Sequence, residues 1–269
     1  MAEADPSRIV LLTGAAGGIG RAMVQALSAR GHRIAAVDRD VAGLERLAAE
    51  QPEVLPILAN LETEPGCTQA FEAAIAHFGR VDAVVNNAGI GVSALRPDAE
   101  TRLPSIEELD AATWDRFFAI NVRAPMLLTR AAVPGMRAQG WGRIVNNTTS
   151  FRTMLRVLPY GATKSALESA SAIWAQELAG TGITVNVLIP GGPTDTAFIG
   201  DGSGWDRAAM LRPAIMGPPL AWLLSNAADG FTGQRIIAAR WDPAQPEAAS
   251  RAIGWPELGA DAVWLQGGR

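Results

Sequence analysis

Tyr160 and Lys164 are the two residues whose types and spacing point most directly to chemistry. Tyr160 is the only tyrosine among 269 residues, and it opens the segment Tyr160-Gly161-Ala162-Thr163-Lys164. Positions i and i+4 of a helix share a face, so the phenol and the ammonium would point the same way. A free phenol has a pKa of about 10, and a nearby positive charge favours its ionised form. A pKa lowered by roughly two to three would make Tyr160 a general acid–base near neutral pH.

A glycine-rich segment near the N-terminus indicates a second function, the binding of a dinucleotide. Thr13-Gly14-Ala15-Ala16-Gly17-Gly18-Ile19-Gly20 lies between an apolar run and an amphipathic stretch of helical length. Glycines let the backbone turn sharply and approach a pyrophosphate, which the N-terminus of the following helix attracts. The candidate cofactor-binding residues of this turn are Thr13, Gly14, Gly18, Ile19 and Gly20.

Asp38 and Arg39 bear on which dinucleotide is bound. Asp38 closes the next apolar run, eighteen positions after Gly20, where a carboxylate can accept hydrogen bonds from the adenosine ribose. It would repel a 2′-phosphate, whereas the guanidinium of Arg39 could hold one. No basic residue lies inside the glycine turn. We therefore expect NAD to be favoured over NADP.

The elements that must position these residues alternate along the whole chain. The expected strands are 8–13, 33–38, 54–58, 81–86, 143–148, 184–189 and 235–239. The expected helices are 19–29, 41–50, 67–77, 114–139 and 160–179. Most of the strands are continuously apolar, as in sheets covered on both faces. The pattern predicts an α/β fold with a doubly wound parallel sheet, in one domain over residues 1–269.

Composition argues against several other classes of protein. The chain carries a net charge of −4, 48% apolar residues, two histidines and one cysteine. A single cysteine allows no internal disulfide, and these counts argue against a zinc site. The mild acidity argues against a nucleic-acid surface, and no run predicts a membrane span or a signal peptide. We expect a cytoplasmic protein with no metal, nucleic-acid or membrane partner.

Several motifs together resemble the short-chain dehydrogenase/reductases, in their compact single-domain branch. The matching segments are Thr13–Gly20, Asn86-Asn87-Ala88-Gly89, Asn121, Tyr160–Lys164 and Pro190-Gly191. They follow the order of the family over about 200 residues. The resemblance implies a Rossmann fold whose seven-stranded parallel sheet has helices on both faces. It also implies NAD(P)-dependent hydride transfer with a secondary alcohol or a ketone.

The resemblance also implies roles for individual residues. Tyr160 would be the acid–base residue, Lys164 would lower its pKa and bind the nicotinamide ribose, and Asn121 would hold a water of the proton relay. The residues implied to line the cofactor are Asn60, Leu61, Asn87, Ala88, Gly89, Pro190, Gly191, Thr194 and Thr196. Asn60 departs mildly from the family, which usually has an aspartate there.

The clearest departure lies at the family's catalytic serine. Alignment on the predicted strand places Thr149 in that position, whereas alignment by distance from the tyrosine places Asn147 there. A strand fixes the direction of a hydroxyl more firmly than the length of a loop does, so Thr149 is favoured and Ser150 is the fallback. A threonine hydroxyl can still donate to a substrate oxygen.

The remaining segments concern substrate and partners. The resemblance implies that residues 192–216 form a lid over a small-molecule alcohol or carbonyl substrate. The lid contains Arg207 and Arg212, and the loop 151–159 contains Arg152 and Arg156. One of these arginines could suit a carboxylate on the substrate, or all of them are exposed loop residues without that role. Residues 241–269, with three tryptophans, form an extension that we expect to dock on its own subunit or on a neighbour. The helices at 114–139 and 160–179 correspond to those that pair subunits in the family, so a homotetramer or homodimer is expected.

Two other functions stay open at this stage. A sugar-nucleotide epimerase or dehydratase fits the glycine spacing, although its usual C-terminal substrate domain is missing here. A nucleotide-sensing regulator with a silent active site fits the altered serine position, although Tyr160 and Lys164 are both kept.

Overall fold

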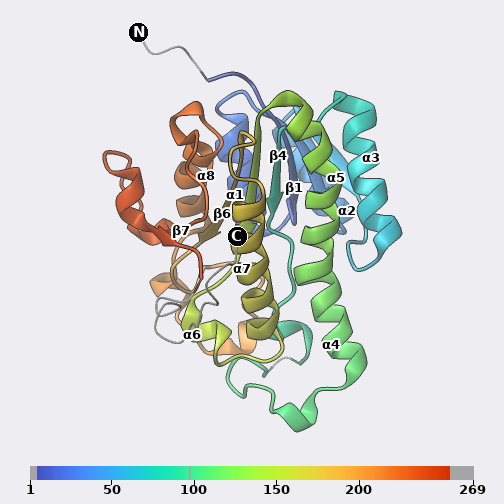
Figure 1. Cartoon of the computed structure of the whole chain (residues 1–269). Coiled ribbons are helices and arrows are strands. Elements are labelled where there is room, and N and C mark those ends of the chain that lie inside the picture. Colours follow the sequence, from blue (N-terminus) through green and yellow to red (C-terminus); the bar gives the residue numbers. More distant parts are fainter. Residues whose placement is uncertain (1–4, 97, 255–269) are drawn as a thin grey trace, which may run out of the picture.

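The computed structural model describes residues 5–96 and 98–254, which fold around one central sheet (Figure 1). Its strand order is β3-β2-β1-β4-β5-β6-β7-β8. The strands are β1 (Ile9–Thr13), β2 (Arg33–Asp38), β3 (Val54–Leu58), β4 (Ala83–Asn86), β5 (Gly142–Asn147), β6 (Ile183–Ile189), β7 (Gln234–Ile237) and β8 (Ser250–Ala252). The order reverses between β1 and β4, and such a switch point opens a crevice at the carboxyl ends of the strands.

The prediction of seven strands was wrong by one. Seven strands are parallel, and the eighth, β8, pairs antiparallel with β7 (Gln234 opposite Ala252, Ile236 opposite Ser250). Three residues with little apolar character give no strand signal of their own. They become a strand because β7 would otherwise present an unpaired edge. The described part of the predicted extension thus begins by completing the sheet.

Helices cover both faces of the sheet. One face packs against α1 (Gly18–Ser28), α2 (Val41–Glu50) and α8 (Gly217–Leu223), and the other against α3 (Glu64–Phe78), α5 (Ala124–Gln139) and α7 (Tyr160–Glu177). Consecutive residues of a strand point to opposite faces, so Val10 and Leu12 join one buried cluster and Leu11 joins the other. This double burial explains why the strands read as continuous apolar runs. Two shorter helices, α4 (Ala111–Phe118) and α6 (Phe151–Met154), lie toward the carboxyl ends of the strands (Figure 1).

The helix expected over residues 114–139 is interrupted. Helix α4 begins after Asp110, whose carboxylate caps it by accepting from the Thr113 N–H at 2.7 Å. A π-helical turn, Ala119–Arg123, then separates α4 from α5. Such turns are rare and often occur at functional sites, and this one holds Asn121. Apolar periodicity continues across the interruption, which is why the sequence pattern did not reveal it.

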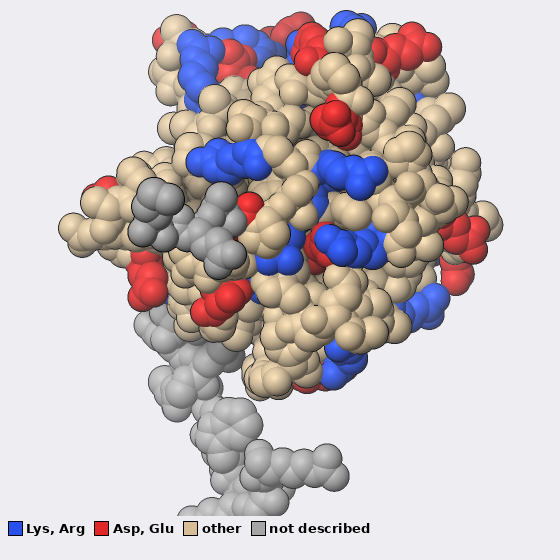
Figure 2. Space-filling view, turned by 90° about the horizontal axis from the view of Figure 1, so that it is seen from above, with Lys and Arg blue, Asp and Glu red and all other residues tan. Residues whose placement is uncertain are grey.

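The surface of the described residues mixes both signs of charge. Figure 2 looks down on the top of the molecule as oriented in Figure 1, and basic and acidic side chains are interspersed there. Some exposed charges of the described residues form ion pairs, such as Arg102 with Glu108 at 2.6 Å. Within residues 5–96 and 98–254, no helix is long and apolar enough to cross a bilayer. The same residues contain no group of three histidine, cysteine, aspartate or glutamate side chains placed to hold a metal ion.

Candidate active site

A cleft of about 1220 Å³ opens along the carboxyl ends of the strands. It extends from the glycine turn before α1 to the lid segment after β6. Its walls bring together most of the predicted residues, namely Gly14, Gly18, Ile19, Gly20, Asp38, Arg39, Asn60, Leu61, Asn87, Ala88, Gly89, Thr149, Tyr160, Lys164, Pro190, Gly191, Thr194 and Thr196. Thr13 and Asn121 are not in the wall; they are buried behind it.

The glycine turn leaves room for a ligand because side chains are absent from it. Gly14 has a positive φ of 65°, and a Cβ there would lie 2.9 Å from the Ala88 Cα. A Cβ on Gly20 would lie 1.9 Å from the Gly14 carbonyl oxygen, so the turn closes this tightly only around glycine. On Gly18 a Cβ would meet the Thr196 methyl at 2.5 Å. The turn therefore packs bare backbone against β4 on one side and the lid on the other.

Thr13 and Asn87 hold the ends of β1 and β4 together. The Thr13 hydroxyl oxygen accepts from the N–H groups of Asn87 and Ala88 at 3.1 and 3.0 Å. The Asn87 amide donates to the carbonyl oxygens of Thr13 and Gly14 at 3.0 and 3.2 Å. Asn147 extends this hydrogen-bond network, because its amide donates to Asn87 Oδ1 at 2.9 Å. The buried Asn147 Oδ1 has no hydrogen-bond partner among the described residues, which leaves an acceptor for a ligand in the cleft.

Asp38 links the second strand to the glycine turn. One carboxylate oxygen accepts from the Ala16 N–H at 3.0 Å, and the other accepts from the N–H groups of Arg39 and Asp40 at 2.7 and 3.1 Å. A carboxylate has about four acceptor positions, so capacity remains for a ligand hydroxyl. The side chain is thus fixed in direction before anything binds.

Tyr160, Lys164 and Thr149 converge at the centre of the cleft. Tyr160 begins α7 directly, and its phenol forms a hydrogen bond with the Thr149 side chain. Lys164, only 3% exposed, lies one turn further on and donates to the Asn147 carbonyl oxygen at 2.7 Å. Its ammonium is 5.8 Å from the centre of the Tyr160 ring. Lys164 is also the only lysine of the chain, and a lysine that occurs once, four positions after the only tyrosine, is a sequence signal that could have singled out the pair.

The expected lowering of the Tyr160 pKa is not produced by the polypeptide alone. Burial raises the pKa of Tyr160 to about 12, and the hydrogen bond from Thr149 opposes this only in part. Burial likewise lowers the pKa of Lys164 to about 8. Removal from water is the main cause of both shifts, because desolvation penalises the charged form of either group.

The neighbours of Thr149 distinguish among the three candidates for the serine position. Ser150 caps α6: its hydroxyl accepts from the Thr153 N–H at 3.1 Å and lies 2.8 Å from the Thr153 hydroxyl. Asn147 uses its amide on Asn87. Thr149 alone of the three has a hydrogen bond to Tyr160. Of these three residues, the structure places Thr149 against the Tyr160 phenol.

Asn121 acts from behind the cleft. Its Oδ1 accepts from the Ile90 N–H at 2.9 Å, and its amide donates to the Ile90 carbonyl and the Thr163 hydroxyl at 3.1 and 3.0 Å. Thr163 in turn donates to the Tyr160 carbonyl at 2.7 Å. A Cβ on Gly89 would lie 3.1 Å from Asn121 Oδ1 and 3.5 Å from the Lys164 ammonium. Asn121 thus ties the loop after β4 to the start of α7.

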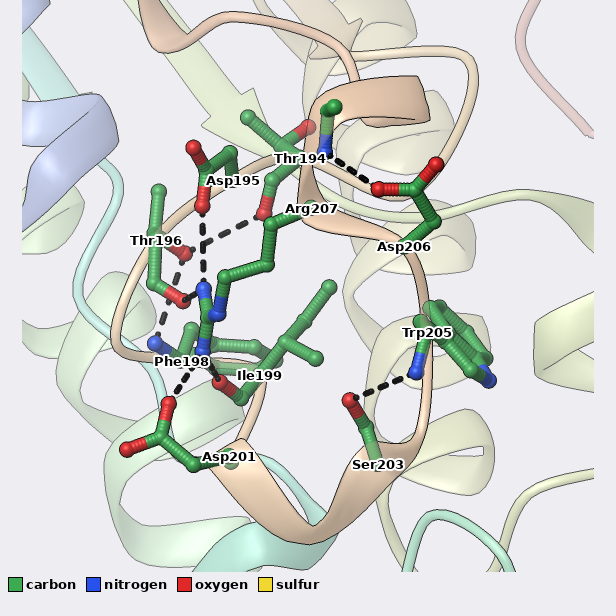
Figure 3. A network of polar contacts seen from close by, with 12 residues as sticks. Thr194, Asp195, Thr196, Phe198, Ile199, Asp201, Ser203, Trp205, Asp206 and Arg207 are labelled. Atoms are coloured by element: carbon green, nitrogen blue, oxygen red, sulfur yellow. Dashed lines mark hydrogen bonds and ion pairs between the residues drawn. The ribbon is translucent and has the colours of Figure 1, made fainter.

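The lid segment is held by its own ion pairs (Figure 3). Arg207 donates to Asp195 and Asp201 at 2.9 and 2.7 Å and to the Ile199 carbonyl at 2.8 Å. Arg212 donates to the second Asp195 oxygen at 2.6 Å. Acidic side chains of the lid thus pair with both lid arginines, whereas Arg152 and Arg156 line the cleft. A contact between an arginine and a substrate carboxylate stays a prediction.

Two contacts that the sequence did not reveal attach the lid to the loop after β4. The Gly200 N–H donates to both oxygens of Glu100, at 3.0 and 3.1 Å. The Ser93 hydroxyl donates to the Phe198 carbonyl at 2.9 Å. These contacts place the Phe198 ring centre 5.6 Å from that of Tyr160. Each joins residues about 100 positions apart, so no local signal could have indicated them.

The crevice at a topological switch point, with a glycine turn at one end and a Tyr–Lys–Thr cluster at its centre, is typical of dinucleotide-dependent oxidoreductases. A model of the family described as short chain dehydrogenase matches residues 8–203. The chain belongs to this family. It is an NAD(P)-dependent oxidoreductase that acts on an alcohol or carbonyl group of a small molecule.

Named relatives and solved structures agree with this assignment. D-threitol dehydrogenase of Mycolicibacterium smegmatis is 33% identical over 68% of this chain and 69% of its own. Human L-xylulose reductase is 36% identical over 68% of this chain and 70% of its own. A 3-ketoacyl-(acyl-carrier-protein) reductase of Brucella melitensis, complexed with NADH, shares 29% identity at a TM-score of 0.72, covering 84% of this chain and 93% of its own. A Beutenbergia cavernae protein assigned as an NAD(P)-dependent gluconate 5-dehydrogenase binds NADP at low occupancy, with 29% identity, a TM-score of 0.75 and coverage of 86% and 94%.

Proposed function

We propose that Tyr160 is the acid–base residue of a secondary-alcohol dehydrogenase or ketone reductase, with Thr149 and Lys164 as its partners. The observation that carries the proposal is the convergence of these side chains midway along the cleft, between the glycine turn and the lid. Hydride transfer needs a proton acceptor beside the carbon that loses the hydride, and a phenol held by a hydroxyl and near an ammonium is a suitable group.

The residues present fit a nicotinamide dinucleotide. Bare backbone at Gly14 and Gly18 would receive the pyrophosphate. Asn147, whose Oδ1 has no partner among the described residues, and Lys164, which uses one donor on the Asn147 carbonyl, both line the cleft and could bind the rest of the cofactor. The remaining predicted contacts are those of Asn60 and Leu61 near the adenine, and of Pro190, Gly191, Thr194 and Thr196 near the carboxamide. When bound, the nicotinamide supplies the acceptor or donor of the hydride.

The protein's own residues then manage the proton and the substrate oxygen. In oxidation, Tyr160 as phenolate removes the proton of the substrate hydroxyl as the hydride leaves the same carbon; in reduction, it returns that proton. Thr149 donates a hydrogen bond to the substrate oxygen in both directions. Lys164 holds positive charge near the phenol, and the oxidised nicotinamide adds more, which together oppose the effect of burial on the Tyr160 pKa. Asn121 would hold a water through the spare lone pair of its Oδ1.

We propose NAD rather than NADP as the preferred cofactor. The Asp38 carboxylate is held by three backbone N–H groups at the place where the adenosine ribose would lie. A fixed negative charge accepts ribose hydroxyls and repels a 2′-phosphate. Arg39, exposed beside it in the cleft wall, is the residue that could reverse this preference.

The decisive experiment follows reduction of NAD, and separately of NADP, with a panel of secondary alcohols, comparing wild type with Tyr160→Phe. Turnover that disappears in the variant while cofactor affinity is kept supports the proposal. Cofactor binding without turnover on any alcohol or ketone would instead favour a regulator with a silent site. A cofactor that stays bound through purification would favour the epimerase or dehydratase.

We also propose a homotetramer or homodimer in the cytoplasm. Exposed apolar side chains on the helices implied in pairing, Ile173 on α7 at 59% and Met126 on α5 at 38%, support a partner surface. The single buried cysteine fits a reducing compartment. Light scattering of wild type and Ile173→Glu tests the assembly: a variant with unchanged mass would contradict pairing through α7.

A further inference from the structure

A buried ion pair lies directly behind the proposed active site. Arg235 on β7 donates to Glu168 on α7 at 2.6 Å, and these side chains are 2% and 0% exposed. Neither residue lines the cleft. Charged residues are almost never buried so completely without a specific reason. The pair joins an outer strand of the sheet to the helix that begins with Tyr160.

The contacts of Arg235 concentrate on the segment that follows β5. Its guanidinium donates to the Thr148 hydroxyl at 3.2 Å and to the Thr149 carbonyl oxygen, and it lies 4.5 Å from the centre of the Phe151 ring. The Thr148 hydroxyl donates to the same Glu168 oxygen at 2.8 Å. Arg235 thus reaches across β6 and contacts the Thr149 carbonyl together with the side chains of Thr148 and Phe151, on either side of Thr149.

This arrangement is costly if its only purpose is to hold the fold together. Arg235 lies opposite the fully buried Val187, whose side chain shares its face of the sheet, so an apolar side chain could be accommodated there. Replacing a buried ion pair with well-packed apolar residues is often neutral or stabilising. Glu168 Oε1 and Arg235 Nε also lack partners among the described residues, which adds to the desolvation cost. The remaining physical reason for the pair is that it holds the groups bound to it in a fixed position.

We propose that Arg235, oriented by Glu168, is a positioning residue that fixes the Thr149 hydroxyl against the Tyr160 phenol. The inference rests on the proposed function of Tyr160 and Thr149. A planar guanidinium can bind the Thr149 carbonyl and the Glu168 carboxylate at once, because its donors point in fixed, divergent directions. A lysine ammonium could keep the charge pair but not both contacts. The position of the hydroxyl is therefore set from β7, whose sequence lies 86 residues away.

The single tyrosine gives this proposal a spectroscopic test. Protein made with 3-fluorotyrosine carries one fluorine reporter, at position 160. Its ¹⁹F resonance is recorded with NADH bound in wild type, in Arg235→Lys and in the double variant Glu168→Leu/Arg235→Met, which leaves no unpaired buried charge. Thr149→Val supplies the resonance expected when the hydroxyl is gone. Turnover is measured on the unlabelled proteins.

Arg143 supplies a matched control. It is equally buried, at 1% exposed, and it donates to the Leu223 carbonyl and pairs with Asp229. It is, however, the second residue of β5 and therefore lies at the amino end of the sheet. The control is the double variant Arg143→Met/Asp229→Asn. It should leave the ¹⁹F resonance and kcat near their wild-type values, even if the variant is less stable.

We expect both Arg235 variants to move the resonance toward that of Thr149→Val and to lower kcat about 10-fold or more, with NADH affinity unchanged. Folded variants with an unmoved resonance and wild-type kcat would overturn the proposal, as would an equal displacement in the Arg143 control. Failure of the wild type to turn over any alcohol or ketone would instead count against the proposed function, because the resonance reports on Tyr160 without turnover.

Discussion

The two ends of the cleft are built in different ways. At the cofactor end, glycines and backbone groups form most of the structure, and the important contacts join Gly14, Asn87 and Asp38 to neighbouring main chain. At the substrate end, the lid depends on side-chain charges, with Arg207 bound to Asp195 and Asp201 (Figure 3). Tyr160 and Lys164 lie where the two ends meet.

This difference in construction bears on which end of the cleft can move. Backbone contacts at buried strand ends leave few alternatives, because a displaced N–H or carbonyl would lose its partner inside the protein. Ion pairs on an exposed loop are screened and exchange readily with water. We therefore expect the cofactor end to be preformed and the proposed lid to open and close over the substrate.

The largest effect is expected at the junction. Tyr160→Phe should lower kcat by about 10²- to 10⁴-fold, the usual contribution of a positioned acid–base group. The cofactor Kd should change little, because the ring and Lys164 stay in place. Steady-state kinetics and fluorescence titration with NADH measure the two quantities. A variant that keeps more than a tenth of wild-type turnover would remove Tyr160 from the proposed role.

Lys164 should make stability depend on alkaline pH. Its pKa in the folded protein, about 8, lies below the ordinary value of 10.5, so the folded state binds this proton less tightly than the unfolded state. Stability should therefore rise from pH 8 toward pH 10.5, by at most about 3 kcal/mol. Denaturant unfolding of wild type and Lys164→Met isolates the effect, since only wild type should show this part of the rise.

The same residue can be observed directly. Because Lys164 is the only lysine, protein labelled with ¹³C-lysine should give one side-chain resonance. In the cofactor-free protein this resonance should titrate near pH 8. A midpoint near 10.5 would mean that the ammonium is well solvated and that the junction is more open than the structure indicates.

At the cofactor end, Asp38→Ala should weaken NAD binding by about 10- to 100-fold, as expected for loss of hydrogen bonds to a charged acceptor. NADP binding should weaken less or improve, because the repulsion is removed. The neighbouring Asp40 is the control, since it caps α2 by accepting from the Gly43 N–H at 3.0 Å. Asp40→Ala should lower stability without changing the ratio of the two affinities.

At the substrate end, the smallest effect is expected. Arg207→Gln should raise KM for substrate by about 3- to 10-fold, in line with the modest strength of exposed ion pairs, and leave the cofactor Kd unchanged. Arg212→Gln, which loses a single partner, should do less. The Arg207 effect should shrink at high salt. An equal loss of cofactor affinity would show that the two ends are not independent.

The parts of the fold and of the site that could be predicted from the sequence are those that depend on short spacings along the chain. The Tyr160–Lys164 pair needs only one helical turn, and the glycine turn only a strand and a helix around it. β2 and β3 were predicted with their observed bounds because β3 is a continuous apolar run and β2 is an apolar run bounded by Arg33 and Asp38. The predicted site residues gather in one cleft because parallel strands bring their carboxyl ends to the same edge.

The sequence by itself determined the alternation of elements, the class of fold, the glycine turn and the Tyr160–Lys164 pair, since each depends on neighbours within a few positions. The other predicted cleft residues followed from the resemblance to the family. The tertiary structure decided that β8 completes the sheet, that a π-helical turn carries Asn121, and that Thr149 rather than Asn147 or Ser150 meets Tyr160. It also decided that the lid arginines bind lid carboxylates and that Arg235 pairs with Glu168. These contacts depend on partners that are brought together only when the chain folds. A charged residue can be buried only beside its counter-charge, and the linear sequence does not show which two charges will meet.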